Sequence, residues 1–450
     1  MSKTIKLKKG FDINLVGEAE KVFAKSESSD TFAIKPTDFR GVVPKLLIEE
    51  NSKVKAGTPL FYSKDLPELV FTAPVSGEVV SIKRGAKRLI QEIIIKADAE
   101  ISYEDFGTGS PASMNREQVV EKLVKSGLWT MLRRRPFSDI PDPKTTPKAI
   151  FVSAFDSSPL APDYDFIVHG QGEAFQIGLD ALKKLTDGTV HLNVNDDEKS
   201  SDVFLRSKGV QINNVSGPHP AGNVGIQIHH IDPINKGEFV WYVGPQDVIT
   251  IGKLFIEGKY NSERIVAVTG SEVKHRKYYS TRIGANLTPM IKDNLVADHV
   301  RIISGNVLTG TTVAADGHLG FYESHVSVIP EGTESEFFGW LTPGFDRPSI
   351  SKALFSYLIP GKKFQANTNL HGEERAFVMT GEYEKVLPMD IYPLQLIKSI
   401  MYNDIEEMEG LGIYEVSEED FALCEFACTS KTDVQAIIAK GLETVKTECF

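Results

Sequence analysis

The sequence predicts an α/β protein of several domains, and three observations support that prediction. The chain has 450 residues, whereas single hydrophobic cores stop growing at roughly 250–300 residues, so we expect about three or four domains. Residues 40–97 show the pattern of short strands broken by turns. From about residue 113 strands alternate with amphipathic helices, which is typical of a domain built on a mostly parallel sheet.

Composition limits the class of protein further. Hydrophobic residues make up 41% of the chain and charged residues 25%, as in ordinary globular proteins. The apolar runs, such as 239–243, are far shorter than the roughly 18 residues that a membrane helix needs. Residues 1–10 lack the apolar stretch of a signal peptide. We therefore expect a soluble, cytoplasmic chain, and the net charge of −11 argues against nucleic acid as a partner.

The first predicted domain, residues 1–100, is an all-β unit. Gly57 and Gly77 supply the positive φ angles that tight turns need. The runs between the turns are rich in β-branched residues, which favour strands. The expected strands are 42–48, 60–62, 69–72, 78–82 and 89–96.

The second predicted domain, residues 101–255, contains the strand–helix alternation. Asn115 and Gln118 have the spacing of a capping box, and Gly127 is expected to end the helix that they begin. A second helix is expected over 173–185 and a third after Asp247. The expected strands are 148–154, 190–194, 203–205 and 240–243.

The last two predicted domains are a β module over residues 256–330 and a helical domain over residues 331–450. In the β module, the expected strands are 264–269, 278–281 and 301–304, with a short helix over 289–295. In the helical domain, Asp390 is expected to cap a helix that ends at Met401. The pairs Ser417 with Asp420 and Thr432 with Gln435 are expected to cap two more helices.

Part of the first domain resembles a known fold family. Residues 54–59 followed by 73–79 resemble the biotinyl/lipoyl barrel-sandwich family. In its carrier domains, a lysine some seven residues before the Ala-Pro pair bears the cofactor. Leu66 occupies that position here, and Lys64 is two residues away from it. The resemblance therefore implies a barrel-sandwich hybrid with a structural or docking role, and carrier chemistry is the less favoured alternative.

The second domain is similar to the NADH-oxidising flavoprotein subunit of respiratory complex I and to the C subunit of the Rnf complex, which implies a Rossmann-like domain. In those relatives, a glycine-rich stretch lets backbone N–H groups approach flavin and nucleotide phosphates. The corresponding residues 127–137 contain no glycine after Gly127. Ser158 stands where the relatives carry an acidic residue before a proline. Both departures imply a degenerate flavin site that holds no FMN.

Two clusters in this domain have alternative interpretations. The triplet Arg133–Arg135 is either a solvated surface or a direct anion site for a nucleotide phosphate. His219 lies between two prolines in the loop 216–225, ahead of His229 and His230. We interpret His219 as hydrogen-bonded within its own loop, with a catalytic base or ligand as the alternative. No serine nucleophile motif lies nearby, so no catalytic residue is assigned.

The cysteines lie in the last 30 residues, at Cys424, Cys428 and Cys449. An iron–sulfur cluster needs about four thiolates, typically with Cys-x₂-Cys spacing. The nearest histidine, His371, is more than fifty residues away in sequence. We interpret Cys424 and Cys428 as structural residues on a helix over 421–428, with no metal and no iron–sulfur cluster in this chain. The pattern also suits a reducing compartment.

The third domain and the whole chain carry two further resemblances. Residues 264–270 with 304–310 resemble the soluble-ligand-binding β-grasp family, which implies a module that packs against its neighbour. The loop 216–225, residues 426–432 and residues 5–12 are similar to the family formed by the A subunits of Na⁺-translocating NADH:quinone reductases. These three segments span nearly the whole chain.

The family resemblance implies a place in a respiratory complex. The complex passes electrons from NADH through flavins to quinone and exports Na⁺, and another subunit oxidises NADH. This chain is then expected as a peripheral subunit on the inner face of the cell membrane. Its expected partners are the membrane-embedded and flavin-bearing subunits of the same complex.

Quinone binding by this chain is a hypothesis based on the family and on aromatic residues. These residues lie in 337–341 and at Phe345, and a quinone head needs an apolar slot with one or two polar donors. A scaffold that docks other subunits without any ligand is the first alternative. A soluble flavin- or nucleotide-dependent oxidoreductase that acts alone is the second, and it predicts a yellow protein.

Overall fold

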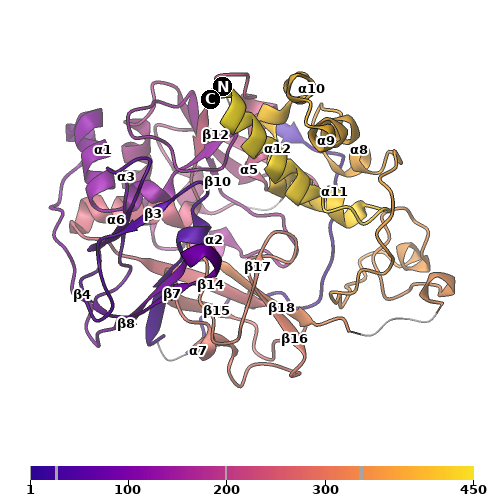
Figure 1. Ribbon diagram of the computed structural model, residues 1–450, viewed down its shortest axis with the longest axis horizontal. Helices are drawn as coiled ribbons and strands as arrows, with labels where there is room; N and C mark the ends of the chain where they lie inside the picture. The colour runs from indigo at the N-terminus through magenta and orange to yellow at the C-terminus, as the bar shows by residue number, and fades with distance from the viewer. Residues whose placement is uncertain (1, 26–28, 198–199, 334–337) are drawn as a thin grey trace.

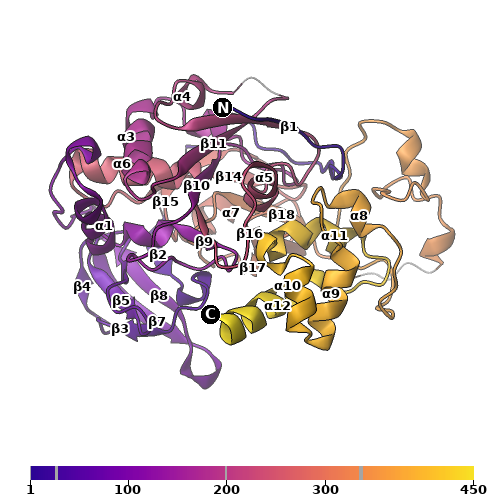
Figure 2. The ribbon, with the colours of Figure 1, turned by 90° about the horizontal axis from the view of Figure 1, so that it is seen from above.

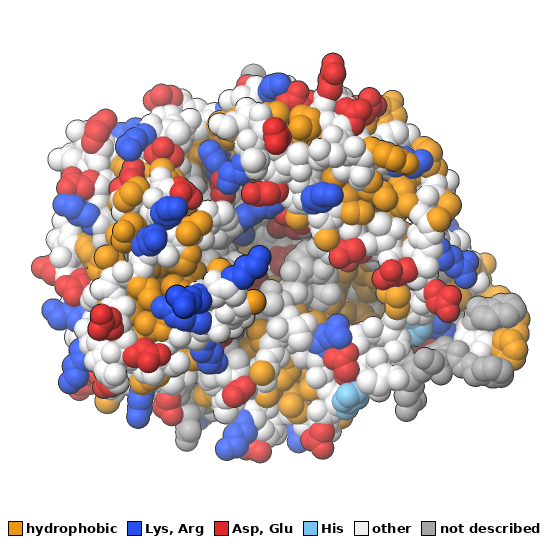
Figure 3. Space-filling view, viewed as in Figure 1, with side chains coloured by type: hydrophobic (Ala, Val, Ile, Leu, Met, Phe, Trp, Pro, Cys, Tyr) orange, Lys and Arg blue, Asp and Glu red, His pale blue; other side chains and the backbone are white. Residues whose placement is uncertain are grey.

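The computed structural model describes residues 2–25, 29–197, 200–333 and 338–450, which fold around four β-sheets (Figure 1). The N-terminal strands and the C-terminal helices flank the largest sheet on opposite sides (Figure 2). A hollow opens near the centre of the face shown in Figure 3. In the described part of the chain, no helix is long and apolar enough to cross a membrane.

The predicted all-β unit is present and consists of two small sheets. Leu60, Phe61, Val79 and Ile93 of its strands are buried and belong to one hydrophobic core. One sheet has the order β2 (Thr31–Ile34), β8 (Ile90–Ala97), β7 (Gly77–Arg84), β4 (Lys53–Val54), and the other β3 (Pro44–Leu46), β5 (Pro59–Ser63), β6 (Val70–Thr72). Gly57 and Gly77 have the positive φ angles predicted for them.

The second domain is built on a six-stranded sheet. Its order is β1 (Thr4–Lys6), β12 (Gln211–Ser216), β11 (Thr189–Asn195), β10 (Ala149–Ser153), β13 (Val240–Tyr242), β9 (Arg133–Arg135). Neighbours from β1 to β13 pair in parallel, and β9 is an antiparallel edge strand. From β10 the chain continues to β11 on one side, whereas β13 lies on the other side. The direction of winding therefore changes between β10 and β13.

Helices cover both faces of this sheet. The residues of β10 alternate between them: Ile150 and Val152 join the core under α3 (Gly172–Lys183) and α6 (Pro245–Glu257), while Phe151 packs on the side of α5 (Val224–Ile231). Helices α3 and α6 touch closely, since a Cβ atom on Gly252 would lie 1.8 Å from the Ala174 carbonyl oxygen. The helix that precedes the sheet, α1 (Arg116–Lys125), begins with the predicted capping box of Asn115 and Gln118.

The remaining residues form a second large sheet and a group of helices. The sheet has the order β15 (Tyr278–Arg282), β14 (Glu263–Thr269), β18 (His325–Pro330), β16 (Val300–Ser304), β17 (Thr311–Val313). The C-terminal helices are α8 (Tyr383–Val386), α9 (Pro393–Tyr402), α10 (Ile405–Gly410), α11 (Ala422–Ala427) and α12 (Val434–Cys449). Between β18 and α8 the chain leaves the body, and we call residues 338–363 the arm (Figures 1 and 2).

Several predicted elements are wrong. Residues 203–205, predicted as a strand, lie in the short helix α4 (Asp202–Leu205), because the Ser201 side chain accepts a hydrogen bond from the Val203 N–H and caps a helical turn. The helix predicted over 289–295 is shorter and begins earlier, as α7 (Thr288–Ile291). A run of three apolar residues, such as 203–205, is compatible with either a strand or a helix. Here the cap formed by Ser201 selects the helix.

Two predicted helix caps in the C-terminal domain are wrong and one is confirmed. Helix α9 begins at Pro393 and not after Asp390, in agreement with the preference of proline for the first helical turn. Helix α12 is capped by Asp433, whose side chain accepts from the Ala436 N–H, and not by Thr432. The capping box of Ser417 with Asp420 is present as predicted.

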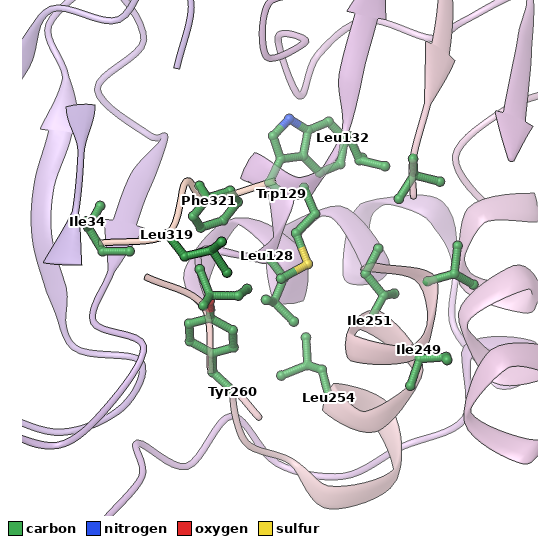
Figure 4. Packing of buried hydrophobic residues seen from close by; sticks show 14 of the residues in the cluster. Ile34, Leu128, Trp129, Leu132, Ile249, Ile251, Leu254, Tyr260, Leu319 and Phe321 are labelled. Atoms are coloured by element: carbon green, nitrogen blue, oxygen red, sulfur yellow. The ribbon is translucent and has the colours of Figure 1, made fainter. Parts of the chain in front are cut away.

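A single cluster of buried side chains connects the first three predicted domains (Figure 4). The cluster contains Trp129 together with α6 residues such as Leu254 and residues of the third domain such as Phe321. The Trp129 ring meets Trp241 edge to face at 5.4 Å, and its Nε1 donates to the Pro141 carbonyl at 2.7 Å. Residues 127–137, which contain Trp129, are called the connecting segment below.

Replacement of Trp129 tests the importance of this shared core. Because its side chain is only 1% exposed, Trp129→Ala is expected to lower the free energy of unfolding by about 3–5 kcal/mol. Urea unfolding followed by circular dichroism measures the change. The control is Tyr402→Ala, at a residue that is 85% exposed, which is expected to change stability by less than about 0.5 kcal/mol. Equal unfolding midpoints for the two variants would show that Trp129 is not important for the stability of the shared core.

Candidate functional site

A cavity of about 160 Å³ lies where the direction of winding of the large sheet changes. In open α/β sheets, ligands bind in the crevice that forms at the carboxyl ends of the strands at such a point. The loops after three parallel strands line the cavity, with Asp156 after β10, His219 after β12 and Gly244 after β13. Asn306 of the third domain and Glu419 of the C-terminal domain complete the wall.

Arg133 enters this cavity from the edge strand β9. Its guanidinium carbon lies 4.4 Å from the ring centroid of Tyr242 and 4.4 Å from that of Tyr322. The Tyr322 hydroxyl donates to the Thr130 carbonyl at 2.7 Å, which fixes one of the two rings. Two aromatic rings therefore lie within cation–π distance of the guanidinium, whose N–H donors lie in the plane of the group.

The other two arginines of the triplet have carboxylate partners. Arg134 pairs with Asp139 through two hydrogen bonds of 2.8 and 2.6 Å. Arg135 is buried and pairs with Glu419 and with Asp420, the latter at 3.2 Å. The triplet is therefore divided: Arg134 and Arg135 are neutralised within the chain, and Arg133 lines the cavity.

The connecting segment is packed with side chains. Leu128, Trp129, Met131 and Leu132 are all buried. Its N–H groups are also occupied, since that of Leu132 donates to the Trp129 carbonyl at 3.1 Å and that of Arg134 to the Asp139 carbonyl at 2.7 Å. These residues do not fit a flavin or its phosphate, because neither the space nor the free N–H groups are present.

The loop after β10 connects to the His219 loop through Ser157. The Ser157 hydroxyl accepts a hydrogen bond from the Gly222 N–H at 2.8 Å and forms another with His219 Nδ1 at 3.0 Å. Next to it, Asp156 accepts from the Ser158 N–H at 2.8 Å. Burial raises the pKa of Asp156. Ser158, where the relatives carry an acidic residue, lines the same cavity.

The histidines predicted in this region serve different contacts. His219 is buried, and burial lowers its pKa to about 4, so its ring is neutral near pH 7. The backbone N–H of His219 donates to the Asp12 carboxylate at 2.8 Å, which connects the loop to the N-terminal segment. His229 hydrogen-bonds to Glu415 at 2.6 Å and His230 to the Pro388 carbonyl at 2.8 Å. These two connect α5 to the C-terminal domain and lie outside the cavity lining.

The cysteines are distant from the cavity lining. Cys424 and Cys428 are buried in the core of the C-terminal helices, whereas Cys449 is exposed. The Cys428 sulfur accepts from the Thr432 N–H at 3.4 Å. Throughout the described residues, no group of three or more His, Cys, Asp or Glu side chains is placed to hold a metal ion. At the other end of the chain, Leu66 is partly buried against the core and Lys64 is exposed.

These features define a class: a multidomain α/β protein with a small β unit at its N-terminus, a cavity at the switch point of its main sheet, and a packed segment in place of a glycine-rich loop. Three family models match consecutive parts of the chain: the NqrA N-terminal barrel-sandwich hybrid domain over residues 5–98, the NqrA second alpha/beta domain over 114–260 and the NQRA C-terminal domain over 265–315. The chain belongs to the NqrA family, the A subunits of Na⁺-translocating NADH-quinone reductases.

Full-length relatives support this assignment. The A subunit of the Na(+)-translocating NADH-quinone reductase of Yersinia pestis bv. Antiqua is 40% identical over 99% of this chain and 100% of its own length. The protein of the same name from Rhodopirellula baltica is 39% identical over 98% of each chain. That of Neisseria meningitidis serogroup B is 38% identical over 99% of this chain and all of its own length. The predicted barrel-sandwich hybrid is thereby confirmed.

The buried pair of Arg135 and Asp420 gives a first prediction for this region. Asp420→Ala leaves the Arg135 guanidinium buried with one partner fewer, so it is expected to lower the free energy of unfolding by about 3–5 kcal/mol. The double variant Arg135→Met/Asp420→Leu removes both charges and is expected to recover most of that loss. Urea unfolding measures both. The control is Glu121→Ala in the exposed pair with Lys125, which is expected to cause no measurable change.

Acid sensitivity gives a second prediction. An unfolded histidine has a pKa of about 6.5, whereas that of folded His219 is lowered to about 4. Between these values the unfolded chain binds the proton, so the stability contributed by neutral His219 is complete above pH ~6.5 and falls as the pH drops towards about 4. His219→Gln is expected to remove about 2–3 kcal/mol of the stability difference between pH 7 and pH 4.5.

Urea unfolding of the wild type and the variant at both pH values measures this difference. His169→Gln, at an exposed histidine, is the control and is expected to keep the acid dependence of the wild type. An equal loss of stability for His219→Gln and the wild type would show that His219 does not titrate in this way.

Proposed function

We propose that the chain is the peripheral subunit of a Na⁺-translocating NADH-quinone reductase on the cytoplasmic face of the membrane. In this proposal it docks on the membrane-embedded and flavin-bearing subunits and supports quinone reduction without a redox cofactor of its own. The observation that carries the proposal is the 40% identity to the Yersinia pestis member of the family over 99% of the chain. Na⁺ export coupled to quinone reduction is then the activity of the whole complex.

The absence of a cofactor in this proposal follows from the connecting segment. We regard the second domain as Rossmann-like, because its parallel strands and flanking helices change direction between β10 and β13. The position that would hold the flavin phosphate contains Trp129, Met131 and Leu132, all buried. A direct phosphate site on the arginine triplet is also disfavoured, since Arg134 and Arg135 already pair with carboxylates.

The third domain fits the proposed role of a packing module. We regard it as a β-grasp-like module that packs against its neighbour, as the sequence resemblance implies, because its residues contact the second domain. Tyr322 stacks on Arg133 and binds the Thr130 carbonyl, and the Ser324 hydroxyl accepts from Gln246 of α6 at 2.8 Å. These contacts support packing of the module against the second domain.

The arm is the surface that we propose for docking. It carries large apolar side chains that are exposed in the isolated chain: Leu341, Phe345, Phe355, Tyr357, Leu358 and Ile359. Leu341 is 64% and Leu358 60% exposed. Exposed apolar groups that gather on one projecting segment are typical of protein or membrane interaction sites. Figures 1 and 2 show that this segment projects from the body.

Quinone contact, the finer part of the hypothesis, fits the arm better than the cavity. Asp156, Glu419 and Arg133 line the cavity, and an uncharged ring would have to desolvate these groups without compensation. On the arm, Phe345 and Phe355 pack edge to face at 5.8 Å and offer an apolar wall. A partner subunit would complete that slot. Of the aromatic stretch 337–341, Phe337 lies outside the described residues.

Two alternatives remain distinguishable by experiment. A scaffold without ligand predicts that a photoreactive quinone labels the complex only on other subunits. A soluble oxidoreductase that acts alone predicts that the purified chain shows the absorbance band of a flavin, which the packed connecting segment disfavours.

The docking proposal is tested with matched surface variants. Leu341→Asp/Leu358→Asp is expected to reduce co-purification of the tagged chain with the membrane subunits by at least tenfold, because two buried charges oppose an apolar interface. The control Leu89→Asp/Leu205→Asp changes two exposed leucines of the body and is expected to co-purify like the wild type. Native pull-down from mildly solubilised membranes, with Na⁺-stimulated NADH:quinone reductase activity, is the measurement.

The two outcomes that contradict the proposal differ. If the arm variant co-purifies as well as the control, the arm is not the docking surface. If the wild-type chain itself is recovered alone, without hydrophobic subunits or activity, the proposed place in the complex is wrong.

A further inference from the structure

Arg133 is half-buried and, unlike the buried Arg135 and Arg264, makes no direct ion pair among the described residues. Arg135 pairs with Asp420 at 3.2 Å, and buried Arg264 pairs with Asp247 at 2.6 Å. No ion pair or hydrogen bond of the Arg133 side chain is found among the described residues, and its Nε is buried without a hydrogen-bond partner. Buried guanidinium groups are normally paired, because an uncompensated charge is costly to desolvate.

We propose that the cavity at the switch point binds a small organic monocarboxylate, whose carboxylate group pairs edge-on with Arg133. This inference is independent of the proposed docking function, since it concerns a different surface of the chain. It also differs from a flavin or nucleotide site, because it requires neither a phosphate cradle nor a glycine-rich loop.

The geometry of Arg133 selects the binding group. Tyr242 and Tyr322 lie within cation–π distance of the guanidinium, and its Nε–H donor has no hydrogen-bond partner among the described residues. Two parallel N–H donors match the two oxygens of a carboxylate. The rings also hold the guanidinium in place before the ligand arrives, which lowers the entropic cost of binding.

The charges around the cavity limit the ligand to a single negative charge. Asp156 and Glu419 line the cavity with Arg133. Glu419 already forms an ion pair with Arg135. A dianion such as phosphate would place two charges near these carboxyl groups against one available cation. A monocarboxylate carries one negative charge and balances Arg133 alone.

The volume limits its size. One water needs roughly 10–15 Å³ of such cavity volume, so about 160 Å³ accommodates a molecule of about ten non-hydrogen atoms. A flavin mononucleotide is several times larger. Other polar groups of the lining, such as the neutral His219 ring and Asn306, favour a ligand with a hydroxyl or keto group in addition to its carboxylate.

The cavity wall also predicts what binding does to the protein. Asp156 and His219 belong to the second domain, Asn306 to the third and Glu419 to the C-terminal domain. A ligand that contacts all three stabilises their association, because it binds the assembled state and not the unfolded chain. Binding is therefore expected to raise the melting temperature of the purified chain in proportion to the logarithm of ligand concentration.

The experiment uses the purified full-length chain at pH 8, where inorganic phosphate is mostly dianionic, with a panel of monocarboxylates from acetate to meta-hydroxybenzoate. Calorimetric titration and the shift in melting temperature measure binding. Meta-hydroxybenzamide is the uncharged control of the same size, inorganic phosphate is the dianion, and a dimethoxy-methyl-benzoquinone represents a quinone head. At least one monocarboxylate is expected to bind, and the amide, the phosphate and the quinone are each expected to bind at least tenfold more weakly.

Variants assign the binding to Arg133. Arg133→Met keeps an unbranched apolar chain between the tyrosine rings and is expected to weaken binding at least tenfold. Arg134→Met is the matched control, since it changes the neighbouring arginine while Asp139 keeps its ion pair with Lys446 at 2.8 Å, and it is expected to leave binding unchanged. Asp156→Asn removes a negative charge from the wall and is expected to strengthen phosphate binding.

Several results would overturn the proposal. These are the absence of binding by every monocarboxylate at about 10 mM, equal binding of the acid and its amide, preferential binding of phosphate or the quinone head, and unchanged binding by Arg133→Met. If Arg133→Met does not fold, Arg133→Lys replaces it. That variant retains the charge without the paired donors, and unchanged affinity would contradict edge-on binding.

Discussion

The packing of the connecting segment is the constraint on which the rest of the structure depends. Residues 127–137 touch every other part of the chain: the N-terminal unit through a hydrogen bond of 3.1 Å from Thr72 to the Ser126 carbonyl next to the segment, the third domain through Tyr322, and the C-terminal helices through Arg135 and Asp420. Trp129 of this segment packs edge to face on Trp241 of the main sheet. Displacement of the segment would therefore disrupt several domain interfaces at once. The arrangement of the domains in this chain therefore depends on the packing of the shared core.

This constraint also bears on the proposed absence of a flavin site in the second domain. A glycine-rich loop keeps a crevice open by the absence of side chains, and its N–H groups remain free for phosphate. Leu128, Met131 and Leu132 instead contribute buried apolar area at the same place, which stabilises the chain by roughly 25 cal/mol for each Å² removed from water. These residues therefore hold the domains together by apolar contacts at this position.

Local signals in the sequence predicted local structure well, whereas the cavity depended on tertiary contacts. The capping boxes at Asn115 and Ser417 are formed within four residues, so their pattern was sufficient. The predicted cap of α12 was wrong by one residue. Thr432 and Asp433 are both suitable capping residues, and only the path of the backbone selects Asp433. The arginine triplet was visible, but the separation of Arg133 from Arg134 and Arg135 requires Tyr242, Tyr322 and Asp420, which lie far away in sequence.

Arg133 is the residue of the connecting segment that packing does not explain. Each other large side chain there is either apolar and buried or charged and paired, as Trp129 and Arg135 illustrate. An unbranched apolar residue would fill the space between Tyr242 and Tyr322 without the cost of desolvating a charge. Two cation–π contacts offset part of that cost, yet they leave the donors along the edge of the guanidinium unsatisfied. A partner that enters the cavity from solvent satisfies them, and the single positive charge determines which partner it is.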